Sequence, residues 1–195
     1  NGAELMDRWG GNSEDECFEL MQQAVDCGVD MISVTVGWQE APESSIGRDI
    51  PPGYWNYLSE RAKKLFPDTL ITFGNRLPDP HMADQCLKDG VFDFWEVCRP
   101  LLADPVWVSK AAEGREDQIT RCISCLWCME SLERNGTRNR GFECAVNPRL
   151  GRERATAEPR CDGAGRVAAV VGAGPAGLTA ARVLAERGFR TVVFE

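Results

Sequence analysis

Apolar and polar residues follow two alternating patterns along the first 114 positions of the chain. Apolar residues at helical spacing predict helices over 14–27, 54–66 and 79–87, with a short helix within 104–114. The first helix begins at the capping-box sequence Ser13-Glu14-Asp15-Glu16. Short β-rich runs predict strands over 31–36, 69–73 and 92–97. Because strands that alternate with helices are typical of βαβ units, we expect an α/β fold with a parallel sheet.

The pattern changes after residue 114. Residues 115–165 are rich in Cys, Asn, Gly, Arg and Pro, which predicts an ordered cofactor loop followed by a linker. A strand over 166–171, a helix over 175–187 and a strand over 191–194 then predict a second βαβ unit. Since the chain begins without Met and stops on the second strand of this unit, we expect it to be a segment of a longer protein.

The composition restricts the class of protein. The net charge of −8 argues against a general nucleic-acid or membrane-surface binder, because either would need a basic face. No apolar run reaches the roughly 20 residues that would span a bilayer. The odd count of nine cysteines favours a reducing compartment, and we expect a cytoplasmic protein. Four of them stand singly in apolar segments and are expected to pack as small hydrophobic residues: Cys17, Cys27, Cys86 and Cys98.

The ends of the predicted strands are the first candidates for chemistry, because ligands collect at the carboxyl ends of parallel strands. These ends are Gly37-Trp38-Gln39-Glu40, Gly74-Asn75-Arg76 and Cys98-Arg99. Arg76 and Arg99 can grip a phosphate together, although the pattern alone also allows ordinary surface arginines. Trp38, Gln39 and Glu40 are candidates for a substrate pocket, with plain packing as the alternative for the tryptophan.

A cysteine motif of the form C-x2-C-x2-C-x15-C follows, made of Cys122, Cys125, Cys128 and Cys144. Three closely spaced thiolates and a distant fourth can ligate an iron–sulfur cluster. Four thiolates also suit a structural zinc ion, but zinc ribbons usually pair two C-x2-C turns. The spacing therefore favours iron–sulfur and leaves zinc as the alternative. The single histidine, His81, falls in a predicted helix and away from any strand end, so no Ser/His/Asp or Cys/His catalytic set is expected.

A glycine-rich turn opens the second βαβ unit with the motif G-x-G-x-x-G. Gly172 permits a tight turn, Gly174 lets the backbone approach a pyrophosphate, and Gly177 lets helix and strand pack closely. Glu195 ends the next strand, where a carboxylate would bind a ribose of FAD or NAD(H). The turn therefore predicts a dinucleotide site.

On these residues the chain resembles the flavin- and iron–sulfur-containing relatives of old yellow enzyme, the group of 2,4-dienoyl-CoA reductase and trimethylamine dehydrogenase. The resemblance rests on six stretches in the family's order: GWQEA (37–41), NRLPDP (75–80), CRPLLADP (98–105), the cysteine motif, CAVNPR (144–149) and VGAGPAGLTAARVL (171–184).

The resemblance implies three domains. Residues 1–115 would be the C-terminal part of an FMN-binding (β/α)8 TIM barrel, and residues 116–165 a 4Fe–4S cluster loop with a linker. Residues 166–195 would be the first, truncated βαβ of a Rossmann-like FAD/NAD(P)-binding domain. The implied FMN residues are Gly74, Asn75, Arg76, Cys98 and Arg99. The four motif cysteines would hold the cluster, and the FAD residues would be Gly172, Ala173, Gly174, Ala176, Gly177 and Glu195.

The implied activity is electron transfer from NAD(P)H through FAD and the 4Fe–4S cluster to FMN, and then to an activated C=C bond of the enoate or dienoyl-CoA type. Gln39 stands where the reductases have a histidine, and a glutamine cannot act as a general acid near neutral pH. The spacing between Cys125 and Cys128 is that of trimethylamine dehydrogenase. An amine dehydrogenase or demethylase is therefore the alternative.

A hypothesis of another class is a non-enzymatic, zinc-binding and nucleotide-sensing module. For the leading hypothesis we expect a small-molecule substrate, no nucleic acid, no membrane and a homo-oligomeric full-length protein. The isolated segment is expected to be inactive, because three strands cannot close an eight-stranded barrel.

Overall fold

The computed structural model describes residues 1–38, 40–138, 140–157 and 160–195. The chain forms two compact units, Asn1–Leu150 and Gly151–Glu195, each with its own parallel sheet. Two parallel sheets with helices between their strands confirm the α/β class. The division between the units falls at neither of the predicted domain boundaries, and the three-domain division stays a prediction.

The sheet of the first unit has the order β1-β2-β3, with β1 at Met31–Ser33, β2 at Leu70–Phe73 and β3 at Phe94–Trp95. Its register pairs Ile32 with Ile71 and Phe73 with Trp95. The first and third strands are shorter than the runs predicted over 31–36 and 92–97. An isolated parallel bridge from Ala3 to Val36 adds the N-terminal segment to the sheet, which the sequence pattern did not predict.

The helices of this unit precede, connect or follow these strands. They are α1 (Glu14–Asp26), α2 (Asn56–Leu65), α3 (Pro80–Lys88), α4 (Arg99–Ala103), α5 (Trp107–Ala112) and α6 (Trp127–Gly136), with 3-10 turns at Asp7–Trp9 and Glu116–Gln118. The predicted capping box is present, since the Ser13 side chain accepts from Glu16 N and the Glu16 carboxylate accepts from Ser13 N. Helix α6 corrects the prediction of a loop and linker over 115–165, because this helix alone takes up ten of those residues.

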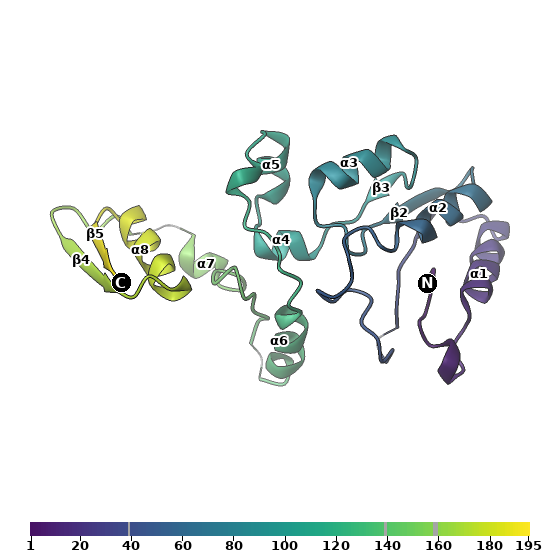
Figure 1. Cartoon of the computed structure of the whole chain (residues 1–195), viewed down its shortest axis with the longest axis horizontal. Helices are drawn as coiled ribbons and strands as arrows, with labels where there is room; N and C mark the ends of the chain where they lie inside the picture. The colour runs from purple at the N-terminus through teal and green to yellow at the C-terminus, as the bar shows by residue number, and fades with distance from the viewer. Residues whose placement is uncertain (39, 139, 158–159) are drawn as a thin grey trace. The chain divides into compact units, whose positions relative to one another are not determined.

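The hydrophobic core lies on one face of the first sheet. Side chains alternate along a strand, so Val34, Ile71 and Phe73 point into the core. Helix α2 packs on β2 and α3 contacts β3 (Figure 1). From the helix side the core receives mainly Phe18, Met21, Leu58, Ala62, Phe66, Ala83 and Cys86.

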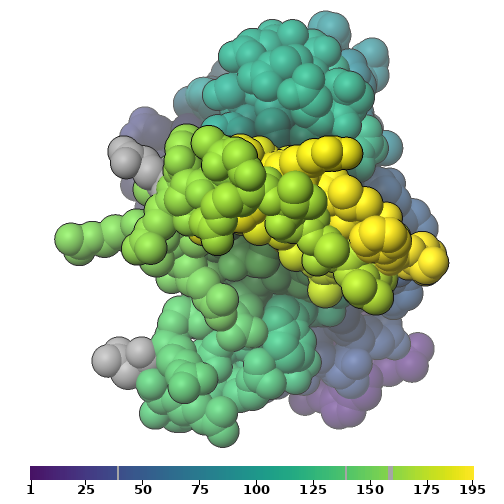
Figure 2. All heavy atoms as spheres, turned by 90° about the vertical axis from the view of Figure 1, so that its left-hand side faces the viewer, coloured from purple at the N-terminus to yellow at the C-terminus, as the bar shows by residue number. Residues whose placement is uncertain are grey.

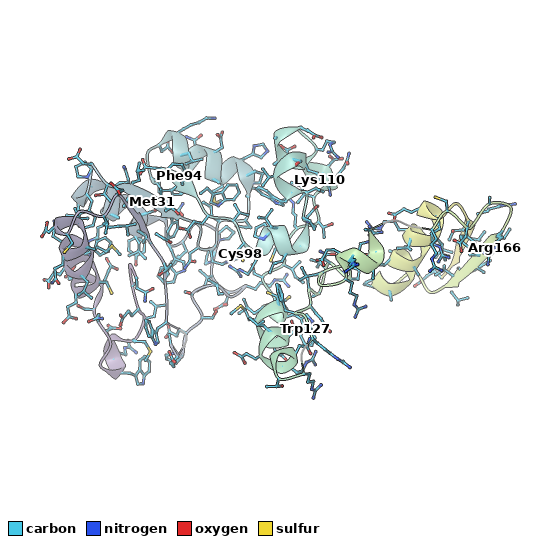
Figure 3. All side chains as sticks on the ribbon, turned by 180° about the vertical axis from the view of Figure 1, so that it is seen from behind. Met31, Phe94, Cys98, Lys110, Trp127 and Arg166 are labelled. Atoms are coloured by element: carbon cyan, nitrogen blue, oxygen red, sulfur yellow. The ribbon has the colours of Figure 1, made fainter. Side chains whose placement is uncertain are left out.

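The opposite face of the same sheet is open. Met31, Leu70 and Phe94 share this face through the strand register and are 46%, 40% and 52% exposed (Figure 3 labels Met31 and Phe94). Cys98 follows on the same side of β3 and is exposed. The packing prediction for the single cysteines is confirmed for Cys17 and Cys86. It is wrong for Cys98 and Cys27, which are both exposed. Cys98 lies on the open face of the sheet, and Cys27 lies just past the end of α1.

The second unit contains β4 (Val167–Val171), α8 (Pro175–Glu186) and β5 (Arg190–Phe194), as predicted for the βαβ unit. It also contains the short helix α7 (Glu153–Thr156), which falls in the predicted linker. Helix α8 packs on both strands (Figure 1). This unit is coloured yellow-green to yellow in Figure 2. Its strand residue Val171 is 87% exposed. Two strands and one helix therefore leave apolar side chains uncovered. In the part of the chain that the structure describes, no helix has the length and apolar character needed to cross a membrane.

A buried carboxylate ties the helices after β3 to the segment that leads into the cysteine motif. Asp104 is only 4% exposed and accepts hydrogen bonds from Lys110 Nζ at 2.6 Å and from the Thr120 amide at 2.9 Å. Burial alone raises the pKa of the Asp104 carboxyl, but these hydrogen bonds outweigh it and the pKa lies below its usual value. The carboxylate therefore stabilises the fold at neutral pH.

Substituting Asp104→Asn should lower the free energy of unfolding by about 2 kcal/mol at neutral pH, because Lys110 loses its buried partner. The folded-state pKa is lower than the unfolded one, so the wild-type advantage should be lost as the pH falls below about 4. Urea denaturation at several pH values measures both effects. The control is Asp84→Asn, whose ion pair with Lys88 is exposed and should contribute less than about 0.5 kcal/mol. Equal losses in the two variants would contradict this account.

Candidate functional site

A cavity of about 290 Å³ opens at the carboxyl ends of β2 and β3. All five residues that the family resemblance implies for FMN line it: Gly74, Asn75, Arg76, Cys98 and Arg99. Cys122 and Ser124 of the cysteine motif line the same cavity. Figure 3 labels Cys98 at the end of β3 and Trp127 at the start of α6, the helix that follows Cys125. Segments that are far apart in the sequence therefore meet at one edge of the sheet.

Gly74 allows the backbone to enter this cavity. A Cβ at this position would lie 2.0 Å from the carbonyl oxygen of Glu96, so only glycine permits the close approach of the two strand ends. Two residues later Arg76 adopts a left-handed backbone with φ of +51°, and Asn75 Nδ2 donates to the Val36 carbonyl at 3.3 Å. The strand end is thus turned sharply, and the turn directs Arg76 into the site.

The Arg76 guanidinium is buried, with 6% of the residue exposed. Its Nε donates to the Ile50 carbonyl at 2.7 Å, and its Nη1 donates to Ser124 Oγ at 2.5 Å. Burial lowers the pKa of Arg76 and the positive charge of Arg99 lowers it further, while Cys122 and Asp49 act in the opposite direction. An arginine nonetheless remains charged in proteins, so the cavity has a fixed positive charge.

Arg99 is the second cation of the cavity and begins helix α4. Its Nη1 donates to the Ile46 carbonyl at 2.8 Å. The hydrogen bonds found for the two guanidinium groups thus lead to neutral oxygens. Two cations held close together by neutral partners repel each other, and an anion between them would relieve that repulsion. The site is therefore suited to a phosphate or another anion.

Glu96 also lines the cavity and was not singled out from the sequence. Its carboxylate accepts hydrogen bonds from Ser33 Oγ at 2.6 Å and from the Thr72 hydroxyl. These three residues belong to neighbouring strands or their ends, so the carboxylate bridges the open face of the sheet. Only the register of the parallel strands could have revealed this cluster.

Two of the three substrate-pocket candidates lie elsewhere. Trp38 is 54% exposed, Glu40 is also exposed, and neither lines the cavity. Gln39, the third candidate, lies outside the described residues. Gly37 before them has φ of +84°, and a Cβ there would lie 2.7 Å from Ser45 Oγ. His81 lies on the surface of α3, with 77% of its side chain exposed.

The cysteine motif wraps around two left-handed residues. Ser124 and Leu126 have φ of +52° and +59°, and α6 begins directly afterwards. Burial raises the pKa of the Cys128 thiol, and the charges of Cys122 and Cys144 contribute in the same direction. Cys122 and Cys144 therefore each lie within electrostatic range of Cys128.

Helix α6 holds the segment that leads to Cys144. The fully buried Ser131 hydroxyl donates to the Cys128 carbonyl at 3.0 Å and accepts from Glu143 N at 2.8 Å. Asn135 Nδ2 donates to the Gly141 carbonyl at 3.0 Å. These bonds fix the distant fourth cysteine beside the helix that contains the third.

Four thiols suit either an iron–sulfur cluster or zinc as a donor set. Among the residues that the structure describes, however, no group of three or more Cys, His, Asp or Glu side chains is close enough to hold a metal ion. The role of the motif cysteines as ligands stays a prediction.

The glycine turn of the second unit has the local geometry of its motif. Gly172 has φ of +96°, and a Cβ on Gly177 would lie 1.9 Å from the Gly172 carbonyl oxygen. A Cβ on Gly174 would contact nothing within 4 Å, so this side of the turn is open. Ala176 lies in the first turn of α8, whose N-terminus faces the turn. The Glu195 carboxylate accepts from the Ala173 amide, which holds it beside the turn.

Comparisons with known proteins find relatives over most of the chain. Residues 170–195 match the model of an NAD(P)-binding Rossmann-like domain. The chain is 34% identical to NADH oxidase of Thermoanaerobacter brockii over 188 residues, covering 95% of this chain and 28% of that protein. It is 32% identical to dimethylamine dehydrogenase of Hyphomicrobium sp. (strain x) over 171 residues, covering 83% of this chain and 22% of that protein.

A solved structure is similar over almost the whole chain. The complex of 2-naphthoyl-CoA reductase with 2-naphthoyl-CoA matches with a TM-score of 0.84 and 33% identity, covering 99% of this chain and 29% of that chain. The chain thus spans less than a third of the length of the relatives it matches. Over that span, the ordered motifs and the shared fold place the chain in the old yellow enzyme-like family of NADH:flavin oxidoreductases.

Proposed function

We propose that the chain is part of a flavin-dependent oxidoreductase that moves electrons from NAD(P)H through FAD and a 4Fe–4S cluster to FMN, and from there to an activated C=C bond. One observation supports this proposal above all. The cavity at the strand ends joins the five implied FMN residues to Cys122 of the cysteine motif. One cavity therefore borders both the proposed anion-binding edge and one thiol of the proposed redox centre.

The first unit would form the C-terminal part of a (β/α)8 barrel, over residues 1–115. Its sheet is parallel, its helices cover one face only, and the apolar residues Met31, Leu70 and Phe94 are exposed on the other. In a closed barrel that face points inward and is covered by the remaining strands. The uncovered face is thus what a part of a barrel should present.

The FMN phosphate would bind at Arg76 and Arg99, with Gly74, Asn75 and Cys98 around it. Guanidinium groups bind phosphate oxygens with two parallel hydrogen bonds, which fixes both position and orientation. A phosphate-binding site at the carboxyl edge of a barrel is also the usual one in that fold. The role of these residues is to bind and orient the flavin.

Residues 116–165 would be the cluster loop and linker, with Cys122, Cys125, Cys128 and Cys144 as ligands. When bound, the cluster would supply one-electron transfer between two flavins that handle electron pairs. The buried Ser131 and the left-handed turns at Ser124 and Leu126 would hold the loop in place. Zinc would be the alternative occupant of the same thiols.

Residues 166–195 would begin the FAD- and NAD(P)-binding region. The open turn at Gly172, Ala173, Gly174, Ala176 and Gly177 would receive a pyrophosphate at the N-terminus of α8. The Glu195 carboxylate would exchange its bond to the Ala173 amide for a ribose hydroxyl. A carboxylate here favours a nucleotide without a 2′-phosphate at this position.

The proposed substrate is a small molecule with an activated C=C bond, such as an enoate or dienoyl thioester. The reductase similarity over 99% of the chain supports this substrate class. The similarity to dimethylamine dehydrogenase, together with the Cys125–Cys128 spacing, supports the alternative of amine oxidation. Trp38, Gln39 and Glu40 are proposed to border the substrate.

Turnover of the intact protein separates the two activities. With NADH or NADPH as donor, a dienoyl-CoA substrate should be reduced, and cofactor oxidation should follow substrate concentration. Methylated amines with an electron-accepting dye should give no turnover. The opposite result would favour the amine dehydrogenase, and absence of both activities in flavin-loaded protein would reject both proposals.

Removing one motif cysteine should remove the cluster. In the intact protein, purified without oxygen, Cys125→Ala should lose most of its iron and acid-labile sulfide, because three thiolates cannot complete a cubane site. The exposed Cys27 lies outside the motif, so Cys27→Ala should keep both elements. Zinc in the wild-type protein, without sulfide, would support the non-enzymatic module instead.

The dinucleotide turn can be tested by adding a single methyl group. In the intact protein, Gly177→Ala should lose most of its bound FAD, because the new Cβ would collide with the Gly172 carbonyl oxygen. A Cβ at Gly136 meets nothing within 4 Å, so Gly136→Ala is the matched control and should keep its FAD. Flavin extraction and chromatography measure FAD and FMN separately. Loss of FMN alone would contradict the assignment of this turn.

A further inference from the structure

Ser124 is a buried residue of the cysteine motif, and its side chain contacts Arg76. It lies between Cys122 and Cys125, and only 7% of it is exposed. Its hydroxyl accepts a hydrogen bond from Arg76 Nη1 at 2.5 Å, across 48 positions of the sequence. Ser124 and Arg76 both line the cavity at the strand ends. The contact therefore joins the cysteine motif to the anion-binding edge.

Both partners of this contact have unusual backbones. Arg76 and Ser124 have φ of +51° and +52°, in the left-handed region that residues other than glycine rarely adopt. Such conformations cost free energy and persist where the surrounding structure fixes them. The two strained residues are joined by the hydrogen bond between Arg76 and Ser124, which helps to hold both backbone conformations.

The hydroxyl completes the orientation of the arginine. The Ile50 carbonyl holds Nε at 2.7 Å, and Ser124 holds Nη1 at 2.5 Å. Two bonds at different nitrogens fix the plane of the guanidinium, which has five N–H donors in a rigid arrangement. The remaining donors are left for a ligand in the cavity that Arg76 lines.

We propose that Ser124 is a positioning residue for flavin phosphate binding, which acts by orienting the Arg76 guanidinium from within the cysteine motif. The inference rests on the proposed function and goes beyond it, because it makes flavin affinity depend on a residue between two proposed cluster ligands. It also assigns the hydroxyl a role that neither the cysteines nor the cluster requires.

The test compares FMN with riboflavin, which lacks the phosphate. The intact protein is prepared without flavin, and each flavin is titrated while its fluorescence is followed. Ser124→Ala and Ser124→Gly should weaken FMN binding about tenfold, because a hydrogen bond to a charged group is lost. Riboflavin affinity should stay unchanged. Glycine adopts the left-handed backbone without strain, so the two variants together separate the hydroxyl from the backbone.

Two further variants serve as controls. Leu126→Gly loosens the second left-handed position of the same loop without removing a hydroxyl, and it should bind FMN as the wild type does. Arg76→Lys should lose most of the preference for FMN over riboflavin, because lysine cannot make the two bonds of the guanidinium. Iron content is measured in every variant and should match the wild type in both Ser124 variants.

The outcomes are distinct. Equal losses of FMN and riboflavin affinity would overturn the positioning role in favour of a general structural one. Wild-type FMN affinity in both Ser124 variants, or loss of FMN affinity in Leu126→Gly as large as theirs, would overturn it as well. If the wild-type protein binds neither flavin, the proposed function fails instead, which is a different result from the failure of this inference.

Discussion

The buried guanidinium of Arg76 is the constraint on which the rest of the site depends. A charge taken out of water must be hydrogen-bonded, and here the partners are a carbonyl from Ile50 and a hydroxyl from Ser124. These partners come from a loop before α2 and from the cysteine motif. Satisfying one buried cation therefore fixes the relative positions of three segments of the first unit.

The sheet provides the second constraint, because its strands are parallel. Parallel strands end at the same edge, so the residues that follow β2 and β3 meet there although the sequence separates them. Gly74 makes the edge narrow, since the Glu96 carbonyl leaves no room for a side chain. The cavity therefore results from strand geometry, and the arginines determine which ligand charge it favours.

The exposed apolar residues of both units have a common cause. A βαβ unit buries one face of its strands under a helix, and the other face needs another layer or further strands. Met31 and Phe94 in the first unit and Val171 in the second remain exposed on this account. The open faces agree with a chain that spans less than a third of the length of its relatives.

The sequence by itself determined the order of strands and helices, the parallel α/β class, the glycine turn at Gly172 and the five strand-end residues among those that line the cavity. These features follow from local periodicity and from the backbone freedom of glycine, both of which depend only on residues that are close together in the sequence. It missed helix α6, the bridge from Ala3 to Val36, and the Glu96 and Ser124 contacts. Only the tertiary structure decided these, because strand register and the partner of a buried charge depend on segments that are distant in sequence.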